Sequence, residues 1–329
     1  MRARAPHAGS GAASSTPTKR ILLPADSGIE RVQEGLAISM ADRIEGVALD
    51  VPGLADAVGM TFVGPSSSGR DAAADGARPP IVLCHGFDSN CLEFRRLFPL
   101  LEQEFDVYAV DILGWGFTDS RGQDCGPEFK RKALAAFIET IVGGPAAVLG
   151  ASLGGALAID LAVARPDLVD RLILVDAQAF ADGLGPVLPA LPRFVTRVAL
   201  EVLRSEPLRR SANQMSYFDK DKYATEDALE VGRLHCSKPD WISGNQTFIE
   251  AGGFKVSTSV SQVAQPTLVV WGEDDKILPE GDRDRFMETL PDPTLCVVPA
   301  CGHVPHLEQP DVVFAKVKAH LLATQEEEG

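Results

Sequence analysis

Short apolar runs alternate along the chain with stretches in which apolar residues recur every three or four positions. The runs predict buried strands at 47–51, 60–63, 81–84, 107–111, 147–151, 172–176, 268–271 and 295–298. Helical spacing predicts helices at 27–42, 92–103, 127–141, 153–164, 280–290 and 312–322. Strands that are apolar almost throughout and alternate with helices are typical of parallel sheets buried on both faces. We therefore predict an α/β fold with a mostly parallel, eight-stranded sheet flanked by helices.

One interval, 178–264, interrupts this alternation. It contains no strong strand signal, opens with Pro186, Pro189 and Pro192, and continues with helical spacing. Open α/β sheets bind ligands beyond the carboxyl ends of their strands, so we expect a helical insertion over that edge and call it the cap. The predicted organisation is a first core segment at 27–177, the cap at 178–264 and a second core segment at 265–324.

The segment 1–26, which precedes the core, is basic and poor in acidic residues. Four Lys and Arg residues and no acidic one precede Asp26, among many Ala, Ser and Thr. Because it lacks an apolar h-region, it does not read as a secretory signal, and its composition is typical of an organelle transit peptide. A disordered tail or a remnant of an expression vector would have similar features. We predict an organelle location, with the cytoplasm as the alternative.

Charge and cysteine content exclude several classes of protein. The chain has 31 Lys and Arg against 46 Asp and Glu, a net charge of −15, which disfavours nucleic-acid binding because phosphate contacts need clustered basic residues. The six cysteines form no CxxC pair and no zinc-finger spacing, so we predict no metal site and no disulfide framework. The uncharged stretch 141–159 is rich in glycine, which favours a strand, a turn and a helix over a transmembrane segment. The oligomeric state is not predictable from the sequence.

The sequence Gly150-Ala151-Ser152-Leu153-Gly154 is the strongest local signal for catalysis. It follows an apolar run and opens a predicted helix, the context in which G-x-S-x-G marks a nucleophilic serine. The two glycines let the strand and the helix approach closely around a strained turn. The positive end of the helix dipole points at the serine oxygen. We therefore predict Ser152 as a nucleophile.

A serine nucleophile needs a base, and the base needs an acid that orients it. His303 lies in the loop after the last apolar run and is the predicted base. His306, three residues further on and near a helix start, is predicted to pack or hydrogen-bond within that loop. The spacing G-x-x-D-x-x-x-P at 272–279 selects Asp275 as the acid, with Asp176 at the end of another strand as the alternative.

Negative charge that develops on a substrate oxygen is stabilised by backbone amides. The amide of Leu153 is one predicted donor, and the amide of Phe87, which follows a predicted strand, is the other. We predict that His85, two residues before Phe87, fixes this loop by hydrogen bonding and takes no part in catalysis. The residues that support the two motifs are His85, Gly86, Gly150 and Gly154.

Four motifs occur in order along the chain. They are HGF at 85–87, DILGWGFTD at 111–119, GASLGG at 150–155, and the segments around Asp275 and His303. Over about residues 47–322 the chain thus resembles the α/β-hydrolase superfamily. The resemblance implies the α/β-hydrolase fold, a cap between strands six and seven, and a Ser152–Asp275–His303 triad in the superfamily's order. The segments GRLHC at 232–236 and AVDILGWGFTDS at 109–120 resemble plant and algal chloroplast-type members, which implies a chloroplast.

The resemblance implies a serine hydrolase that cleaves a small-molecule carboxylic ester through an acyl-enzyme, without a metal or an organic cofactor. Haloalkane dehalogenases and epoxide hydrolases of this fold use an aspartate nucleophile where this chain has Ser152. C–C bond hydrolysis or acyl transfer on the same triad, or hydrolysis of a chlorophyll-type phytol ester, are alternatives. A non-catalytic ligand-binding protein on this fold is the alternative from another class.

The cap is expected to select the substrate. Its many aromatic and aliphatic side chains predict an apolar pocket and therefore an ester with medium or long apolar acyl or alcohol groups. These side chains are Phe180, Leu184, Leu188, Leu191, Phe194, Val198, Met215, Tyr217, Phe218, Trp241 and Phe248.

Overall fold

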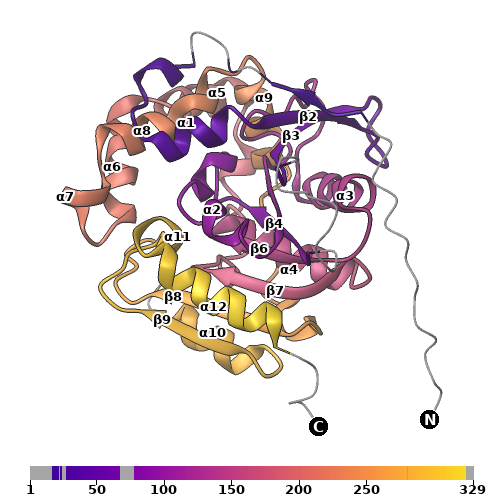
Figure 1. Ribbon diagram of the computed structural model, residues 1–329. Coiled ribbons are helices and arrows are strands. Elements are labelled where there is room, and N and C mark those ends of the chain that lie inside the picture. Colours follow the sequence, from indigo (N-terminus) through magenta and orange to yellow (C-terminus); the bar gives the residue numbers. More distant parts are fainter. Residues whose placement is uncertain (1–16, 22, 24–26, 67–77, 280, 324–329) are drawn as a thin grey trace.

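The computed structural model describes residues 17–21, 23, 27–66, 78–279 and 281–323. Within them the centre of the molecule is one sheet of nine strands in the order β1-β2-β3-β5-β4-β6-β7-β8-β9 (Figure 1). Neighbouring strands from β5 to β9 are parallel, whereas β1, β2 and β3 form an antiparallel edge. The strands are β1 Lys19–Arg20, β2 Ile44–Leu49, β3 Val58–Val63, β4 Pro80–Cys84, β5 Asp106–Val110, β6 Ala146–Ala151, β7 Val169–Val175, β8 Thr267–Gly272 and β9 Thr294–Val298.

Eight of these strands, β2 to β9, lie at the eight apolar runs, which confirms the predicted α/β fold with its mostly parallel sheet. The ninth, β1, adds an edge strand by pairing Lys19 with Gly46 and Arg20 with Glu45. It lies inside the segment 1–26, which the sequence predicted to be disordered or transit-like. The strand consists of two exposed basic residues, which show no alternation of apolar and polar positions. The sequence pattern therefore did not predict it.

Both faces of the sheet are covered, as parallel strands require. Along β4 the fully buried Ile81 and Leu83 face one side and the fully buried Val82 and Cys84 face the other. Helices α3, α4 and α10 pack on the second side, and α1, α2 and α12 on the first. The helices are α1 Gly35–Ala41, α2 Phe98–Leu101, α3 Pro127–Phe137, α4 Leu153–Ala164, α5 Arg193–Leu203, α6 Glu206–Ser216, α7 Lys220–Tyr223, α8 Glu226–Arg233, α9 Trp241–Glu250, α10 Asp282–Thr289, α11 Pro305–Glu308 and α12 Pro310–Leu322.

Two predicted helices are divided in the structure. The helix predicted at 27–42 is a 3-10 turn at Ile29–Arg31 followed by α1, and the one predicted at 92–103 is a 3-10 turn followed by the single turn α2. In the first case the backbone amides at 33–34 donate to the carboxylate of Asp227, each over 2.6 Å. A side chain from the cap thus takes donors that a continuous helix would have used internally.

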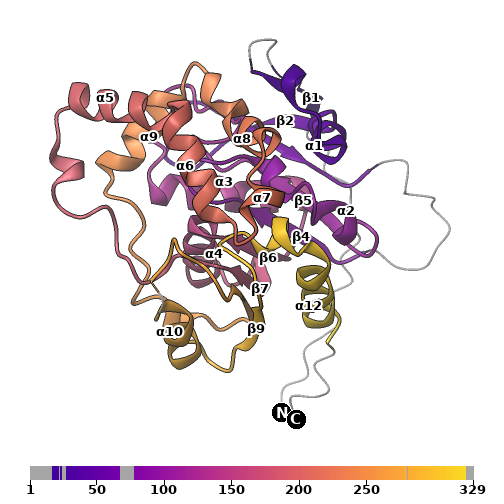
Figure 2. The same cartoon turned by 90° about the vertical axis from the view of Figure 1, so that its left-hand side faces the viewer.

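Helices α5 to α9 follow β7 and precede β8, and Figure 2 shows them gathered on one side of the molecule. Every residue between these two strands is described, and none of them forms a strand. Within the group, α5 packs on α9 and α6 packs on α8. This interval therefore holds the helices expected of the cap, and its domain boundaries at 178 and 264 stay a prediction.

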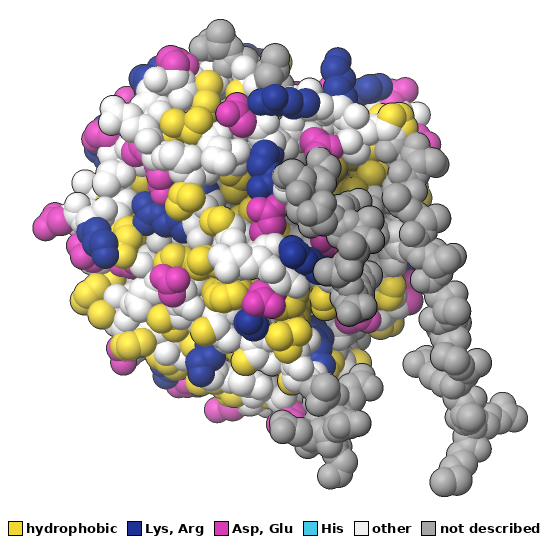
Figure 3. Space-filling view, viewed as in Figure 1, with side chains coloured by type: hydrophobic (Ala, Val, Ile, Leu, Met, Phe, Trp, Pro, Cys, Tyr) yellow, Lys and Arg dark blue, Asp and Glu magenta, His cyan; other side chains and the backbone are white. Residues whose placement is uncertain are grey.

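The remaining sequence predictions concern cysteines, membranes and the chain ends. All six cysteines are free and buried. No helix in the described part of the chain is long and apolar enough to cross a membrane, and 141–159 contributes to β6 and α4. On the face in Figure 3, acidic and basic side chains are interspersed. Residues 1–16 and the acidic end at 325–329 lie outside the described residues, so the transit-peptide prediction stays open.

Candidate active site

Ser152 lies at a sharp turn between β6 and α4. Its backbone angles, φ 50° and ψ −120°, fall in a region that side-chain-bearing residues rarely adopt. Two glycines make room for this turn. A Cβ atom on Gly150 would lie 2.4 Å from the carbonyl oxygen of Gly154, and one on Gly154 would lie 2.2 Å from that of Cys84. The strained turn therefore depends on the glycine spacing that the sequence analysis singled out.

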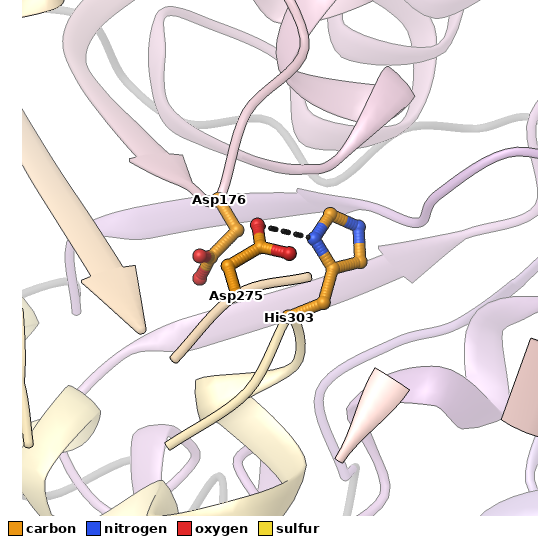
Figure 4. Close-up of side chains that lie close together, drawn as sticks. All are labelled: Asp176, Asp275 and His303. Atoms are coloured by element: carbon orange, nitrogen blue, oxygen red, sulfur yellow. Dashed lines mark hydrogen bonds and ion pairs between the residues drawn. The ribbon is translucent and has the colours of Figure 1, made fainter. Parts of the chain in front are cut away.

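His303 and Asp275 form a hydrogen-bonded pair at the carboxyl edge of the sheet, after β9 and β8. His303 Nδ1 lies 2.8 Å from Asp275 Oδ2, and Figure 4 shows the second ring nitrogen turned away from Asp275. Burial raises the pKa of Asp275, but the hydrogen bond and charge of His303 outweigh it and hold this pKa below its ordinary value. The ionised carboxylate orients the ring with Nδ1 as the donor.

A second carboxyl group, that of Asp176, lies beside this pair (Figure 4). It follows β7, is fully buried, and accepts hydrogen bonds from the amide of Gly272 at 3.0 and 3.2 Å. Burial and the charge of Asp275 raise its pKa well above the ordinary value, which favours the neutral form. Asp275, and not the alternative Asp176, makes the hydrogen bond to His303; its catalytic role stays a prediction.

In the described part of the chain, a metal ion could be held by one group of side chains, namely these three. Their ligand atoms, on Asp176, Asp275 and His303, lie within 4.8 Å of one another. His303 Nδ1 and Asp275 share one hydrogen bond, and both oxygens of Asp176 lie within hydrogen-bond distance of the single amide of Gly272. Each of the three side chains therefore already has a hydrogen-bond partner among the described residues.

Two backbone amides near Ser152 have no acceptor. Among the described residues, neither the N–H of Phe87 nor that of Leu153 donates to a protein oxygen. A Cβ atom on Gly86 would lie 3.3 Å from the Cβ of Ser152, so the loop that carries Phe87 packs directly against the serine. Amides inside a fold are rarely left unpaired. Two free donors near a serine oxygen are therefore candidates for binding a negatively charged oxygen.

His85 fixes the same loop. Its Nδ1 lies 2.8 Å from the carbonyl oxygen of Gly86, and its Nε2 accepts from the amide of Ile112 at 3.1 Å. Burial lowers its pKa, which keeps the ring neutral with Nδ1 as the donor. Both nitrogens therefore hold main chain, in keeping with the predicted supporting role.

A cavity of about 320 Å³ lies between the carboxyl edge of the sheet and helices α6 and α8. Ser152, His303 and Phe87 all line it, and the pair partner Asp275 does not. Further lining residues come from the cap: Arg209, Ala212, Asn213, Ser216, Tyr217, Ala228, Leu229, Val231, Gly232 and Arg233.

Most of the cap residues named from the sequence for an apolar pocket lie elsewhere. Of that group, Tyr217 lines the cavity. Trp241 and Phe248 are fully buried between cap and core, whereas Phe194 is 72% and Val198 63% exposed. Apolar periodicity marked the helices correctly but does not tell which face of each helix meets the cavity.

Glu93 lines the cavity and was missed by sequence reasoning. It accepts hydrogen bonds from the amide of Gly86 at 3.2 and 3.3 Å, and His306 Nε2 lies 3.3 Å from its Oε1. Burial raises its pKa, but the contact with His306 outweighs burial and brings it down to about 2. His306 therefore belongs to the support of this loop, and no local pattern distinguished Glu93 from a surface acid.

Comparison with known proteins decides the family. A family profile described as "Alpha/beta hydrolase family" matches residues 81–316, which is more than half of the chain. The chain belongs to the alpha/beta hydrolase family. This hydrolase is 36% identical over 235 residues to "Alpha/beta hydrolase domain-containing protein VTE7" of Arabidopsis thaliana, a match that covers 71% of each chain.

Two further relatives are informative. The hydrolase is 26% identical to "2-hydroxy-6-oxo-6-(2'-aminophenyl)hexa-2,4-dienoic acid hydrolase" of Metapseudomonas resinovorans, over 72% of this chain and 81% of that protein. A solved structure of a thermophilic esterase from Thermogutta terrifontis superposes with a TM-score of 0.69 at 22% identity, over 84% and 97% of the two chains. These matches confirm the resemblance to the α/β-hydrolase superfamily and its fold.

Proposed function

We propose that this hydrolase is a serine esterase that cleaves carboxylic esters through an acyl-enzyme. The proposal rests on one observation, which is that Ser152, His303 and the loop with the unpaired amide of Phe87 all meet in one cavity. Asp275 stands behind His303 at hydrogen-bond distance. Nucleophile, base, orienting acid and oxyanion donor are the parts that acyl transfer needs.

In the proposed mechanism Ser152 Oγ attacks the ester carbonyl carbon while His303 Nε2 takes the hydroxyl proton. Asp275 stabilises the imidazolium, and the amides of Phe87 and Leu153 bind the oxyanion. The tetrahedral intermediate collapses, and the departing alkoxide takes the proton from His303. Water then loses a proton to His303 and attacks the acyl group, which releases the acid and restores Ser152.

Apolar acyl or alcohol groups are the proposed substrate class. The cavity of about 320 Å³ is at the small end of ligand sites. Leu229 and Val231 of α8 and Ile277 of the core contribute apolar wall to it. We expect kcat/KM to rise from an acetyl to an octanoyl ester; a flat or falling profile would contradict this preference. A phytol ester, with its long apolar alcohol, stays an alternative.

C–C bond hydrolysis is the second candidate, because the relative from Metapseudomonas resinovorans is named as a dienoic acid hydrolase. The same serine, histidine and aspartate would serve that reaction. A vinylogous 1,5-diketone, tested beside the esters, separates the two activities. Turnover of the diketone without turnover of any ester would replace the first proposal by the second.

The test of the esterase proposal is the hydrolysis of p-nitrophenyl esters by wild type, Ser152→Ala and Ser216→Ala. Ser216 is a matched control because it lines the same cavity, and its hydroxyl donates to the carbonyl of Ala212 at 2.9 Å. We expect Ser152→Ala to lose about 10⁴-fold or more of kcat and Ser216→Ala to stay within about threefold. A fluorophosphonate probe should label Ser152 alone; hydrolysis retained by Ser152→Ala would overturn the mechanism.

We further propose that the interval 178–264 acts as the substrate-selecting cap.

We also propose that the protein works in a chloroplast or another organelle. The relationship to a plant protein supports the location. A fluorescent protein fused behind residues 1–26 tests it in plant or algal cells. Fluorescence confined to the cytoplasm would favour the alternative.

A further inference from the structure

Asp88 directly follows the proposed oxyanion donor Phe87 and is buried where the core meets the cap. It is 2% exposed, and its φ of 46° lies in the left-handed region that residues with a side chain seldom adopt. Such a conformation is strained and persists only where the surroundings impose it. The contacts of Asp88 therefore determine how this loop is held.

The Asp88 carboxylate takes each of its hydrogen-bond donors, among the described residues, from the cap. Arg209 of α6 donates to Oδ2, and Trp241 Nε1 of α9 donates to Oδ1 over 2.8 Å. His235 Nε2 lies 3.1 Å and Asn245 Nδ2 3.5 Å from the same Oδ1. These five residues are called the Asp88 cluster below.

The cluster holds an ionised carboxylate. Burial raises the pKa of Asp88, but the charge of Arg209 and the hydrogen bond from His235 hold it below its ordinary value. A buried charge is costly unless its partners stay in place. The core loop and the cap are therefore coupled, since moving one without the other would strand this charge.

Arg209 also holds the main chain of the loop. Its Nη1 donates to the carbonyl oxygen of Asp88 over 3.1 Å. On the other side of Phe87, the amide of Gly86 is bound by the Glu93 carboxylate. The free amide of Phe87 thus lies between two anchored residues, one held by the core and the other by the cap.

The Phe87 ring adds a contact of the same kind. It packs edge-on against Trp115 of the core, at 5.3 Å between ring centroids, and its ring is tilted against that of Phe248 of α9 at 6.2 Å. Trp115 Nε1 in turn donates to Asn245 of the Asp88 cluster at 3.0 Å. Side chain and main chain of residue 87 are therefore both placed with reference to the cap.

We propose that Asp88 and Arg209 are positioning residues through which the docked cap sets the Phe87 amide in the oxyanion hole. The cap then does more than enclose the substrate, because the catalytic rate depends on its docking. This inference rests on the proposed serine-hydrolase function and deepens it. It predicts a loss of kcat without a matching change in KM, since an oxyanion donor acts mainly in the transition state.

The experiment compares Arg209→Met and Asp88→Asn with Arg131→Met. Methionine keeps the apolar stem of Arg209 and removes both contacts to Asp88. Arg131 is a matched control because it forms a half-buried ion pair with Asp160 at 2.9 Å between α3 and α4, away from the cavity. All rates are measured well below each variant's Tm, together with the rate of labelling by a fluorophosphonate.

We expect kcat and the labelling rate to fall about 10- to 100-fold in Arg209→Met and Asp88→Asn, short of the 10²–10³ for losing an oxyanion donor outright. KM should stay within about threefold, Arg209→Lys should recover part of kcat, and Arg131→Met should match wild type. Unchanged kcat in both variants, or a change in KM alone, would overturn the positioning role. Activity retained by Ser152→Ala in the same assay would instead overturn the proposed function.

Discussion

Two buried aspartate–histidine pairs in this hydrolase have similar geometry and different surroundings. The nitrogen–oxygen distance is 2.8 Å in Asp275–His303 and 3.1 Å in Asp88–His235. His303 gives one ring nitrogen to its aspartate and lines the cavity beside Ser152. The first pair thus borders the cavity through His303, at the carboxyl edge of the sheet.

The second pair is enclosed between core and cap. His235 is fully buried, and it uses both ring nitrogens: Nε2 meets Asp88, and Nδ1 lies 3.2 Å from Asn90 Nδ2. No ring nitrogen is left to exchange a proton with a substrate. The comparison teaches that the hydrogen bond between aspartate and histidine is not enough for catalysis. The histidine also needs a free ring nitrogen that faces a cavity.

The largest effect expected is the loss of activity in Asp275→Asn. Asparagine cannot stabilise the imidazolium and favours the wrong tautomer of His303, so we expect kcat for a p-nitrophenyl ester to fall about 10⁴-fold. Thermal unfolding of the variant serves as the control for folding. A loss below about tenfold would place Asp275 outside the catalytic group.

His235→Gln should lower the stability of the protein and largely keep its activity, the reverse of what we expect for Asp275→Asn. The shorter amide leaves Asp88 or Asn90 without a donor or acceptor, and an unsatisfied buried polar group costs about 1–3 kcal/mol. We therefore expect that loss in the free energy of unfolding, measured with urea, and a kcat within about tenfold of wild type for the folded protein. A 10⁴-fold loss of kcat at unchanged stability would make the two pairs equivalent and contradict the comparison.

The buried polar contacts around the Asp88 cluster include Lys130, whose effect on the free energy of unfolding should depend on pH. Its ammonium lies 3.4 Å from the ring centroid of Trp115 and donates to the carbonyl of Leu113. Burial lowers its pKa to about 7, well below the ordinary value for lysine. Above pH 7 the folded protein releases this proton while the unfolded chain still binds it, so the contribution of Lys130 to the free energy of unfolding should rise with pH from about 7 to 10.

Lys130→Met lacks this titration. The difference in unfolding free energy, wild type minus variant, should therefore grow with pH by at most about 1.4 kcal/mol per unit. Urea unfolding at pH 7, 8 and 9 measures it. A difference that stays constant over this range would show that Lys130 keeps its charge in the folded protein.

The smallest effect is expected for Asp176→Asn. Because burial and the charge of Asp275 raise the pKa of Asp176 and favour its neutral form, an amide of the same shape should preserve the environment of Asp275. We expect kcat within about threefold of wild type. A loss near that of Asp275→Asn would mean that Asp176, the alternative acid, shares in orienting His303.

Local patterns predicted the sheet and selected the residues of the candidate site. Apolar runs located β2 to β9. In the parallel strands β4 to β8 the run is continuous because a buried parallel strand must be apolar on both faces. The glycines around Ser152 revealed its turn, because a Cβ at Gly154 would meet main chain at 2.2 Å. Such features depend on residues a few positions apart, and this is why a sequence alone displays them.

Only the tertiary structure decided which side chains complete the site. The partners of Asp88 lie 121 to 157 residues away along the chain, and Glu93 meets His306 from another segment. The cap face that lines the cavity and the break before α1 depend equally on distant contacts. Hydrogen bonds and charges act over a few ångströms in space, so no spacing along the sequence encodes which distant groups will satisfy one another.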